Sequence, residues 1–175
     1  MTEHILEAYR DDIQYRVYGL EPANDQGWRV ECHEIEKEGI IYKDSNIIAE
    51  AFPVSHGNWP NAWGFRFTTP DKVIVISGDC VPSEKVAEYS KGANILVHEV
   101  YSKAGYDTRP QHWKEYHSLH HTSTVELAGI VKRARPEKLV LYHILFWGSS
   151  EAELLQEIHS VYKGRVFVGQ DLDIF

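Results

Sequence analysis

The stretch Val73–Val81, VIVISGDCV, decides the fold that the sequence predicts. It opens with four consecutive β-branched residues, which are typical of a buried strand. A Ser-Gly pair then ends the strand and leaves the carboxylate of Asp79 at its carboxyl end. Because α/β folds place their chemistry at the carboxyl ends of strands, Asp79 is a candidate metal ligand or proton carrier. The alternative is that Asp79 only caps a turn.

Two histidines lie at similar positions farther along the chain. His56 follows an apolar strand expected over 47–54, and His143 ends another expected over 138–142. With Asp79, these residues place ligand-type side chains at three strand ends. For His56, a structural role in which the ring bonds a nearby carbonyl is an equal alternative.

The rest of the chain predicts one α/β domain over 1–175, with a mixed sheet flanked by helices. From Val73 onward, strands alternate with helices, and two capping boxes mark helix starts at Ser123 and Ser150. Before Val73, short alternating segments favour an antiparallel meander, which begins with a strand over 28–33. A helix is expected over 2–18, and 101–120 is expected to be a long loop that serves as a lid or binding segment.

Composition narrows the classes of partner. The formal charge is −8 and no run of Lys or Arg occurs, which argues against nucleic acid, because phosphate binding needs clustered cations. No apolar run reaches the ~20 residues of a membrane span. The acidic N-terminus has no signal-peptide core, so a cytoplasmic location is expected. In that compartment, no disulfide is expected between Cys32 and Cys80.

Five segments carry a resemblance to a known family. In chain order they are AFPVSHGNWPNAWGFRF with His56, SGDC with Asp79, LVHEVY with His98-Glu99, HHTSTVELA with His121, and LVLYHILFWG with His143. Together they resemble the second half of a metallo-β-lactamase-fold hydrolase, in the ribonuclease Z-like and arylsulfatase-like branch. The resemblance implies that the chain forms the C-terminal αβ half of a four-layer αβ/βα sandwich.

The resemblance also implies roles for the site residues. It assigns His56, Asp79 and His143 as metal ligands, with Asp79 bridging two metals and taking part in catalysis. Zinc is the metal implied first, with manganese or iron as alternatives. It assigns His121 as the catalytic proton donor, and Glu99 could orient His98 or His121 by accepting an imidazole proton.

The sequence also departs from the family in two places. Its signature, His-x-His-x-Asp-His, is absent here, and in the family it lies upstream of the resembling segments. The chain therefore resembles half an enzyme, which would hydrolyse an ester or phosphoester of a small molecule when the missing half is supplied. After His143, the apolar run at 144–148 replaces the Ser/Arg-rich continuation of ribonuclease Z proper, which argues against transfer-RNA processing.

An alternative function is non-catalytic. The chain would then be an inactive remnant that serves as a dimeric binding or assembly module. In both cases the missing half would leave one apolar face of the sheet uncovered, and such a face is rarely left bare in a monomer. A homo-oligomer, or a complex with the missing N-terminal half, is therefore expected.

Overall fold

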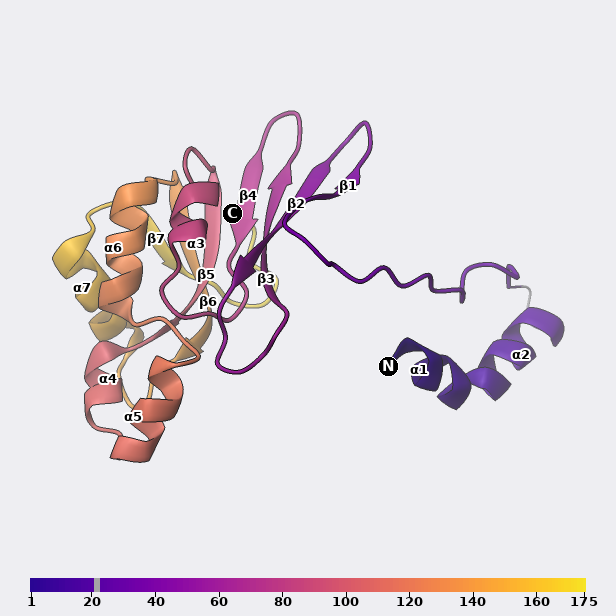
Figure 1. The fold of residues 1–175 in the computed structure, drawn as a ribbon, viewed down its shortest axis with the longest axis horizontal. Helices are drawn as coiled ribbons and strands as arrows, with labels where there is room; N and C mark the ends of the chain where they lie inside the picture. Colours follow the sequence, from indigo (N-terminus) through magenta and orange to yellow (C-terminus); the bar gives the residue numbers. More distant parts are fainter. Residues whose placement is uncertain (21–22) are drawn as a thin grey trace. The chain divides into compact units, whose positions relative to one another are not determined.

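The computed structural model describes residues 1–20 and 23–175 (Figure 1). Contacts within the chain divide it into two compact units, residues 1–36 and residues 37–175, which are described separately. The larger unit contains every strand of the described residues and all the candidate site residues. No helix in the described part of the chain is long and apolar enough to cross a membrane.

The first unit corrects two expectations. The helix expected over 2–18 is divided into α1 (Thr2–Ala8) and α2 (Arg10–Tyr18), because Tyr9 between them leaves helical geometry (φ −98°, ψ 8°). The Tyr9 amide still donates to the Ile5 carbonyl at 3.1 Å, so the break is a local bend. The strand expected over 28–33 is wrong, because residues 29–36 have no regular structure. Alternation alone was not enough here, since a strand also needs a partner.

The second unit is a mixed sheet whose strands lie side by side in chain order. The strands are β1 (Gly39–Lys43), β2 (Ile48–Val54), β3 (Ala62–Thr68), β4 (Val73–Ile76), β5 (Ile95–Tyr101), β6 (Lys138–Leu145) and β7 (Val166–Val168). Strands β1 to β4 pair antiparallel, and β4 to β7 pair parallel. The α/β class with a mixed sheet flanked by helices is therefore confirmed, and β4, the strand of the VIVI segment, joins the two halves.

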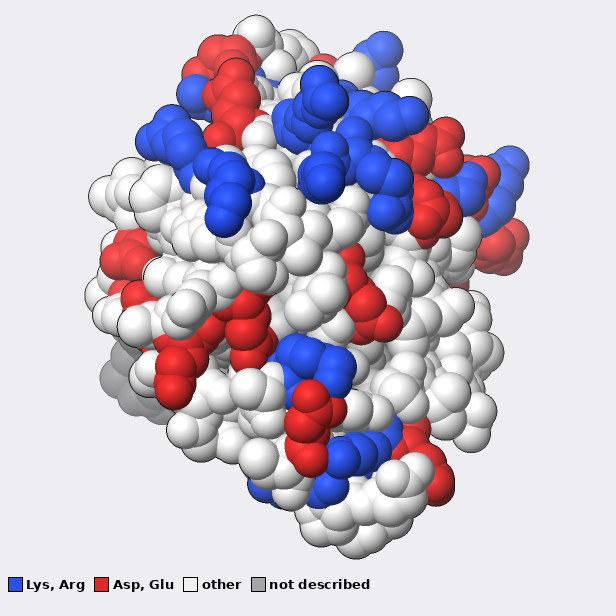
Figure 2. Space-filling model, turned by 90° about the vertical axis from the view of Figure 1, so that its left-hand side faces the viewer, with Lys and Arg blue, Asp and Glu red and all other residues white. Residues whose placement is uncertain are grey.

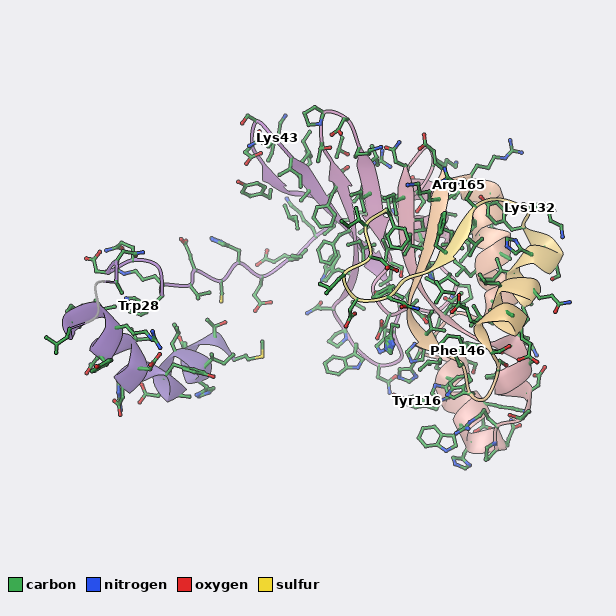
Figure 3. All side chains as sticks on the ribbon, turned by 180° about the vertical axis from the view of Figure 1, so that it is seen from behind. Trp28, Lys43, Tyr116, Lys132, Phe146 and Arg165 are labelled. Carbon is green, nitrogen blue, oxygen red and sulfur yellow. The ribbon has the colours of Figure 1, made fainter. Side chains whose placement is uncertain are left out.

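Three helices pack together along one face of the sheet (Figure 1): α3 (Glu84–Tyr89), α6 (Thr124–Ala134) and α7 (Glu151–Val161). Both expected capping boxes are present, at Ser123 for α6 and Ser150 for α7. The core lies between these helices and the strands, and its fully buried side chains include Phe52, Val75, Leu96, Leu127, Leu139 and Ile158. Burying each such side chain stabilises the fold by about 1.5–3 kcal/mol. The chain after β7 turns back across the opposite face of the sheet (Figure 3).

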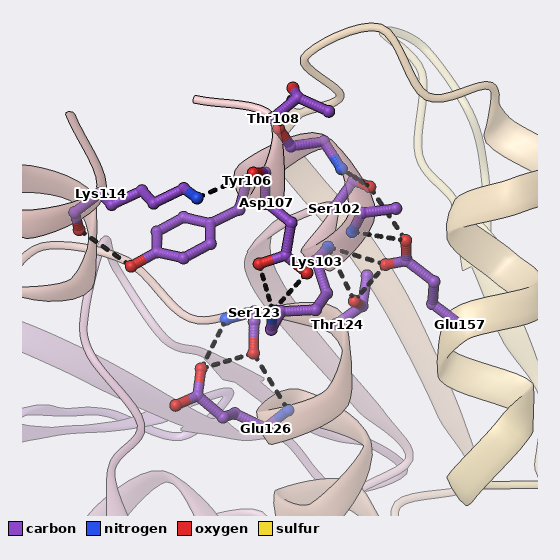
Figure 4. A network of polar contacts seen from close by, with 12 residues as sticks. Ser102, Lys103, Tyr106, Asp107, Thr108, Lys114, Ser123, Thr124, Glu126 and Glu157 are labelled. Carbon is purple, nitrogen blue, oxygen red and sulfur yellow. Dashed lines mark hydrogen bonds and ion pairs between the residues drawn. The ribbon is translucent and has the colours of Figure 1, made fainter. Parts of the chain in front are cut away.

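The segment 101–120 is not a loop. It contains α4 (Lys103–Asp107) and α5 (Gln111–Ser118). The first turn of α4 is held by Glu157 of α7, whose carboxylate accepts hydrogen bonds from the amides of Lys103 at 2.8 Å and Ala104 at 3.0 Å (Figure 4). Because this capping group comes from a distant helix, the local sequence gives no sign of it.

Candidate active site

His143 lies at a β-bulge in β6, inside the strand and not at its end as expected. The pairing with β5 places Glu99 opposite Tyr142 and Val100 opposite Ile144, so His143 is the extra residue. Its backbone is left-handed, with φ 43°. For a residue with a side chain this conformation costs on the order of 1–3 kcal/mol, and such strain is concentrated at functional sites. Bulges also redirect side chains near active sites.

The bulge directs the His143 ring toward Asp79. Nε2 of His143 lies 3.1 Å from Oδ2 of Asp79, and both side chains are partly exposed. Asp79 is placed by Gly78, which has a φ of +65° and lies so close to β3 that a Cβ atom there would come within 2.7 Å of the Trp63 carbonyl oxygen. Only glycine suits both conditions, so Gly78 fixes the carboxylate of Asp79 at the end of β4.

His56 approaches the same place from the β2–β3 connection. Its Nδ1 lies 2.8 Å from the main-chain carbonyl oxygen of His120 and donates to it, because a carbonyl oxygen can only accept. The structural role that the sequence left open is therefore present. It is compatible with a ligand role, because metal-binding histidines donate one ring N–H to such a group and keep the other nitrogen for the metal. Nε2 of His56 remains available for a metal.

His121 lies between the other two histidines. Its ring centroid is 5.3 Å from that of His56 and 5.6 Å from that of His143. The structure thus brings together all four residues that the sequence singled out: His56, Asp79, His121 and His143. Three of them come from the ends or bulges of strands, and His121 comes from the turn before α6.

A buried glutamate faces His121. Oε1 of Glu99 accepts hydrogen bonds from the amides of Thr122 at 2.8 Å and Cys80 at 3.3 Å. Oε2 of Glu99 lies 3.5 Å from Nδ1 of His121, and both atoms are buried without a hydrogen-bond partner. Of the two histidines that Glu99 could orient, its carboxylate faces His121. His98 instead contacts the Glu99 main-chain oxygen through Nδ1 at 2.6 Å.

Cys80, which follows Asp79, is a poor metal ligand here. Its side chain is fully buried. Burial, and then the nearby carboxylates of Glu99 and Asp79, raise the pKa of the Cys80 thiol to about 12. With no metal bound, a thiol with this pKa is protonated at neutral pH.

The donor atoms fit a zinc or iron site in type but do not complete one. Imidazole and carboxylate are ligands that both metals accept. Among residues 1–20 and 23–175, however, no group of three or more His, Cys, Asp or Glu side chains is placed to hold a metal ion. Asp79 and His143 touch directly, and His56 and Asp79 line one hollow of about 240 Å³. Within the described residues, the donors that lie close together are thus fewer than a complete metal shell needs.

The sequence missed the aromatic surroundings of this cluster. The ring of His117 lies between those of Trp113 (centroids 5.5 Å apart) and Trp147 (4.4 Å). Burial, His121 and Arg109 lower the pKa of His117. The only sequence signal for these surroundings was the abundance of aromatic residues and histidine in 101–120. That segment shows no helix or strand periodicity.

The fold and this cluster define an α/β protein of the metallo-β-lactamase type. A family model described as "Beta-lactamase superfamily domain" matches residues 2–144. The chain therefore belongs to the metallo-β-lactamase superfamily, and its resemblance to the ribonuclease Z-like branch is confirmed. Members of this superfamily generally bind zinc or iron.

The relatives identified by sequence carry the name ribonuclease Z. That of Mycobacterium sp. (strain KMS) is 28% identical over 170 residues, which are 96% of this chain and 59% of the relative. The putative ribonuclease Z of Mycobacterium tuberculosis (strain CDC 1551 / Oshkosh) is 27% identical over 174 residues, 98% of this chain and 77% of the relative. The chain thus spans about three fifths of the length of the first curated relatives it matches.

Solved structures show the same fold. The metallo-beta-lactamase fold protein YhfI from Bacillus subtilis superposes with a TM-score of 0.62 at 18% identity, over 79% of this chain and 50% of that one. The short form of human tRNase Z superposes with a TM-score of 0.55 at 23% identity, over 79% and 45% of the two chains. At these identities the likeness concerns the fold alone.

These comparisons overturn the expectation that nucleic acid is excluded as a partner. The relatives bear the name of a ribonuclease, and one structural neighbour is named for transfer RNA. The argument from charge was wrong because the net charge of a chain does not show how its charged side chains are distributed over the surface. Figure 2 shows Lys and Arg side chains gathered at one end of the helical face, although no basic run occurs in the sequence. Two exposed cations from separate elements, Lys132 of α6 and Arg165 before β7, lie toward the same end of the second unit (Figure 3).

Proposed function

We propose that this chain supplies one part of the active site of a metal-dependent hydrolase that cleaves phosphoester bonds. The observation that carries the proposal is the contact between Asp79 and His143 at a strained bulge, beside His56 and His121. Membership of the superfamily supports hydrolysis, and the names of the relatives support a phosphoester, the bond class that ribonucleases cleave.

His56, Asp79 and His143 would hold the metal, together with ligands from outside this sequence. Zinc is proposed first, with manganese or iron as alternatives. A bound metal of this kind would supply an activated water at neutral pH. The chain's own contribution would be two imidazoles and one carboxylate, held at strand ends and at the bulge in β6, where the bulge and Gly78 fix the directions of His143 and Asp79.

His121 would donate a proton to the leaving oxygen. Its Nδ1 faces the carboxylate of Glu99, which leaves Nε2 as the nitrogen that can reach a substrate. The turn before α6 also places His121 close to a helix N-terminus, where the helix dipole favours an anionic group. A phosphoester bound there would meet both the proton donor and the positive end of α6.

Complementation tests the proposal. The chain is mixed with the separately expressed segment of the Mycobacterium sp. (strain KMS) ribonuclease Z that it does not cover, in the presence of zinc or manganese. Hydrolysis of bis(p-nitrophenyl) phosphate is expected only in the mixture, and it is expected to be lost with His143→Ala. The control is His33→Ala, whose exposed side chain lies in the first unit. Equal restoration by the His143→Ala chain would rule out the proposed role.

The second candidate function is an inactive binding or assembly module. The absence of a three-donor group among the described residues is the observation that favours it. Metal analysis of the chain, mixed with the complementing segment and purified, separates the two candidates. About one metal per chain, lost in His143→Ala, supports the hydrolase. A folded chain without metal, which light scattering shows to be a dimer, supports the module.

A further inference from the structure

Helix α5 presents its aromatic side to solvent. Trp113 and Tyr116 are 42% and 46% exposed, and Leu119 just after the helix is 62% exposed. Their spacing of three residues places them along one side of the helix. The rings of Trp113 and Tyr116 meet edge to face, with centroids 5.8 Å apart. No residue of α5 is buried, so this helix does not use its aromatic residues for the core.

This aromatic side leads directly to the candidate active site. The ring of Tyr116 stacks on that of His120, with centroids 4.1 Å apart and planes 20° apart. The ring of His120 in turn meets that of His56 edge-on at 5.0 Å. The backbone reinforces the link, because the Gly57 amide donates to the Leu119 carbonyl oxygen at 2.7 Å. Tyr116 is therefore one ring away from a proposed metal ligand.

A third exposed aromatic ring lies at the site itself. Trp59 lines the hollow that contains His56 and Asp79, and this residue is 69% exposed. The Trp59 amide donates to the His56 carbonyl oxygen at 3.1 Å, which fixes the turn that carries both residues. We call Trp59, Trp113 and Tyr116 the stacking surface.

Two cations lie on α5 or just before it. Lys114 of α5 donates to the main-chain oxygen of Asp107, an uncharged acceptor, so no carboxylate neutralises it in that contact. Arg109, just before the helix, lies 5.8 Å from the centroid of the Trp147 ring. The one carboxylate of α5, that of Glu115, accepts from Gln111. Exposed rings with cations nearby suit a ligand that is anionic and carries planar groups. They suit an aliphatic protein surface less well.

We propose that the stacking surface holds unpaired nucleobases of a single-stranded RNA on either side of the phosphoester to be cleaved. The proposal rests on the proposed function and names its substrate class. Aromatic side chains stack on any base, because every base has a π-face, and nearby cations hold the backbone. Exposed aromatic rings that reach a phosphoester site suit this ligand.

Binding without metal tests the proposal independently of hydrolysis. In EDTA, fluorescence anisotropy measures the Kd of a labelled eight-nucleotide single-stranded RNA and of an abasic oligomer with the same sugar-phosphate backbone. The wild-type chain is expected to bind the RNA about tenfold more tightly than the abasic oligomer. Trp113→Leu, Tyr116→Leu and Trp59→Leu are each expected to weaken RNA binding by about tenfold and to leave abasic binding unchanged.

Two matched variants serve as controls for this test. Tyr42→Leu removes a similarly exposed ring from β1 and is expected to change nothing. Tyr116→Phe keeps the ring and is expected to keep the affinity, which separates stacking from a loss of folding. Equal affinity for RNA and abasic oligomer, no RNA binding, or leucine variants that bind like the wild type would overturn the proposal. Base-dependent binding without hydrolysis in the complementation assay would uphold it and count against the proposed function alone.

Discussion

Nε2 of His143 lies 3.1 Å from Oδ2 of Asp79, and this contact exists because the backbone of His143 takes a left-handed conformation at a bulge. In a regular parallel pair the side chains of β6 would alternate between the two faces of the sheet. The extra residue breaks that alternation and directs one imidazole along the sheet edge toward the end of β4. The fold therefore accepts local strain at the position proposed to hold the metal.

His143→Ala is expected to lower the affinity of the chain for zinc by at least tenfold, because it removes one of the proposed donors. Isothermal titration calorimetry with zinc chloride measures this affinity. His33→Ala is the control, and its zinc affinity is expected to equal that of the wild type. Unchanged zinc affinity in His143→Ala would exclude this residue as a ligand.

The strain at the same position predicts a difference between two substitutions. Alanine keeps a Cβ atom at φ 43°, whereas glycine adopts this conformation freely. His143→Gly is therefore expected to be more stable than His143→Ala by about 1 kcal/mol. Urea unfolding followed by circular dichroism measures both free energies. Equal stability of the two variants would show that the bulge is not strained at this residue.

Glu99 is expected to matter for both stability and the site. Its buried carboxylate accepts from the amides of Thr122 and Cys80, and it faces His121. Glu99→Ala leaves those two amides without a partner, so a loss of about 1–3 kcal/mol in the free energy of unfolding is expected. Glu99→Gln keeps one accepting oxygen and is expected to lose less. Denaturant unfolding of the two variants tests the order, and a larger loss in Glu99→Gln would contradict it.

The sequence predicted most strands of the sheet because these depend on local patterns, and the structure brings together the four residues that the sequence singled out. The β-branched run before Asp79 and the apolar runs before His56 and His143 are readable without tertiary information. What the sequence did not predict was the bulge, since the register of β6 depends on its pairing with β5. The placement of Glu99 opposite His121 likewise depends on amides from segments far apart in the chain.

The helices in 101–120 were also not predicted from the sequence. Local periodicity indicates no helix there, because aromatic and polar residues are mixed along α5. The start of α4 is held by the local cap Ser102 and also by Glu157, more than 50 residues downstream. Conversely, the alternation of apolar and polar residues over 28–33 predicted a strand, but this segment pairs with no other strand and has no regular structure. A pattern decides an element only where packing agrees with it.

Glu157 is expected to hold α4 in place. Besides the Lys103 and Ala104 amides, its carboxylate accepts from the hydroxyls of Ser102 and Thr124 (Figure 4). Glu157→Ala is expected to lower the free energy of unfolding by about 1–3 kcal/mol, because the Ala104 amide loses its acceptor, while the Lys103 amide and the Ser102 hydroxyl keep contacts with Thr124 and Ser149. The control is Glu151→Ala, an exposed residue in the first turn of the same helix. Thermal and urea unfolding measure the difference, and equal effects of the two variants would contradict this role.

His98 is expected to make the fold sensitive to acid. Burial lowers the pKa of His98 below its usual value of 6.5. Between that value and the lower pKa of the folded state, the unfolded chain binds more protons, so the free energy of unfolding falls as pH falls below about 6.5. In His98→Asn, whose side-chain amide can still donate to the Glu99 carbonyl oxygen, this contribution is absent. Urea unfolding at pH 7.5, 6.0 and 5.0 is expected to show a steeper loss of stability for the wild type than for the variant. Identical slopes would mean that His98 takes up its proton equally in the folded and unfolded states.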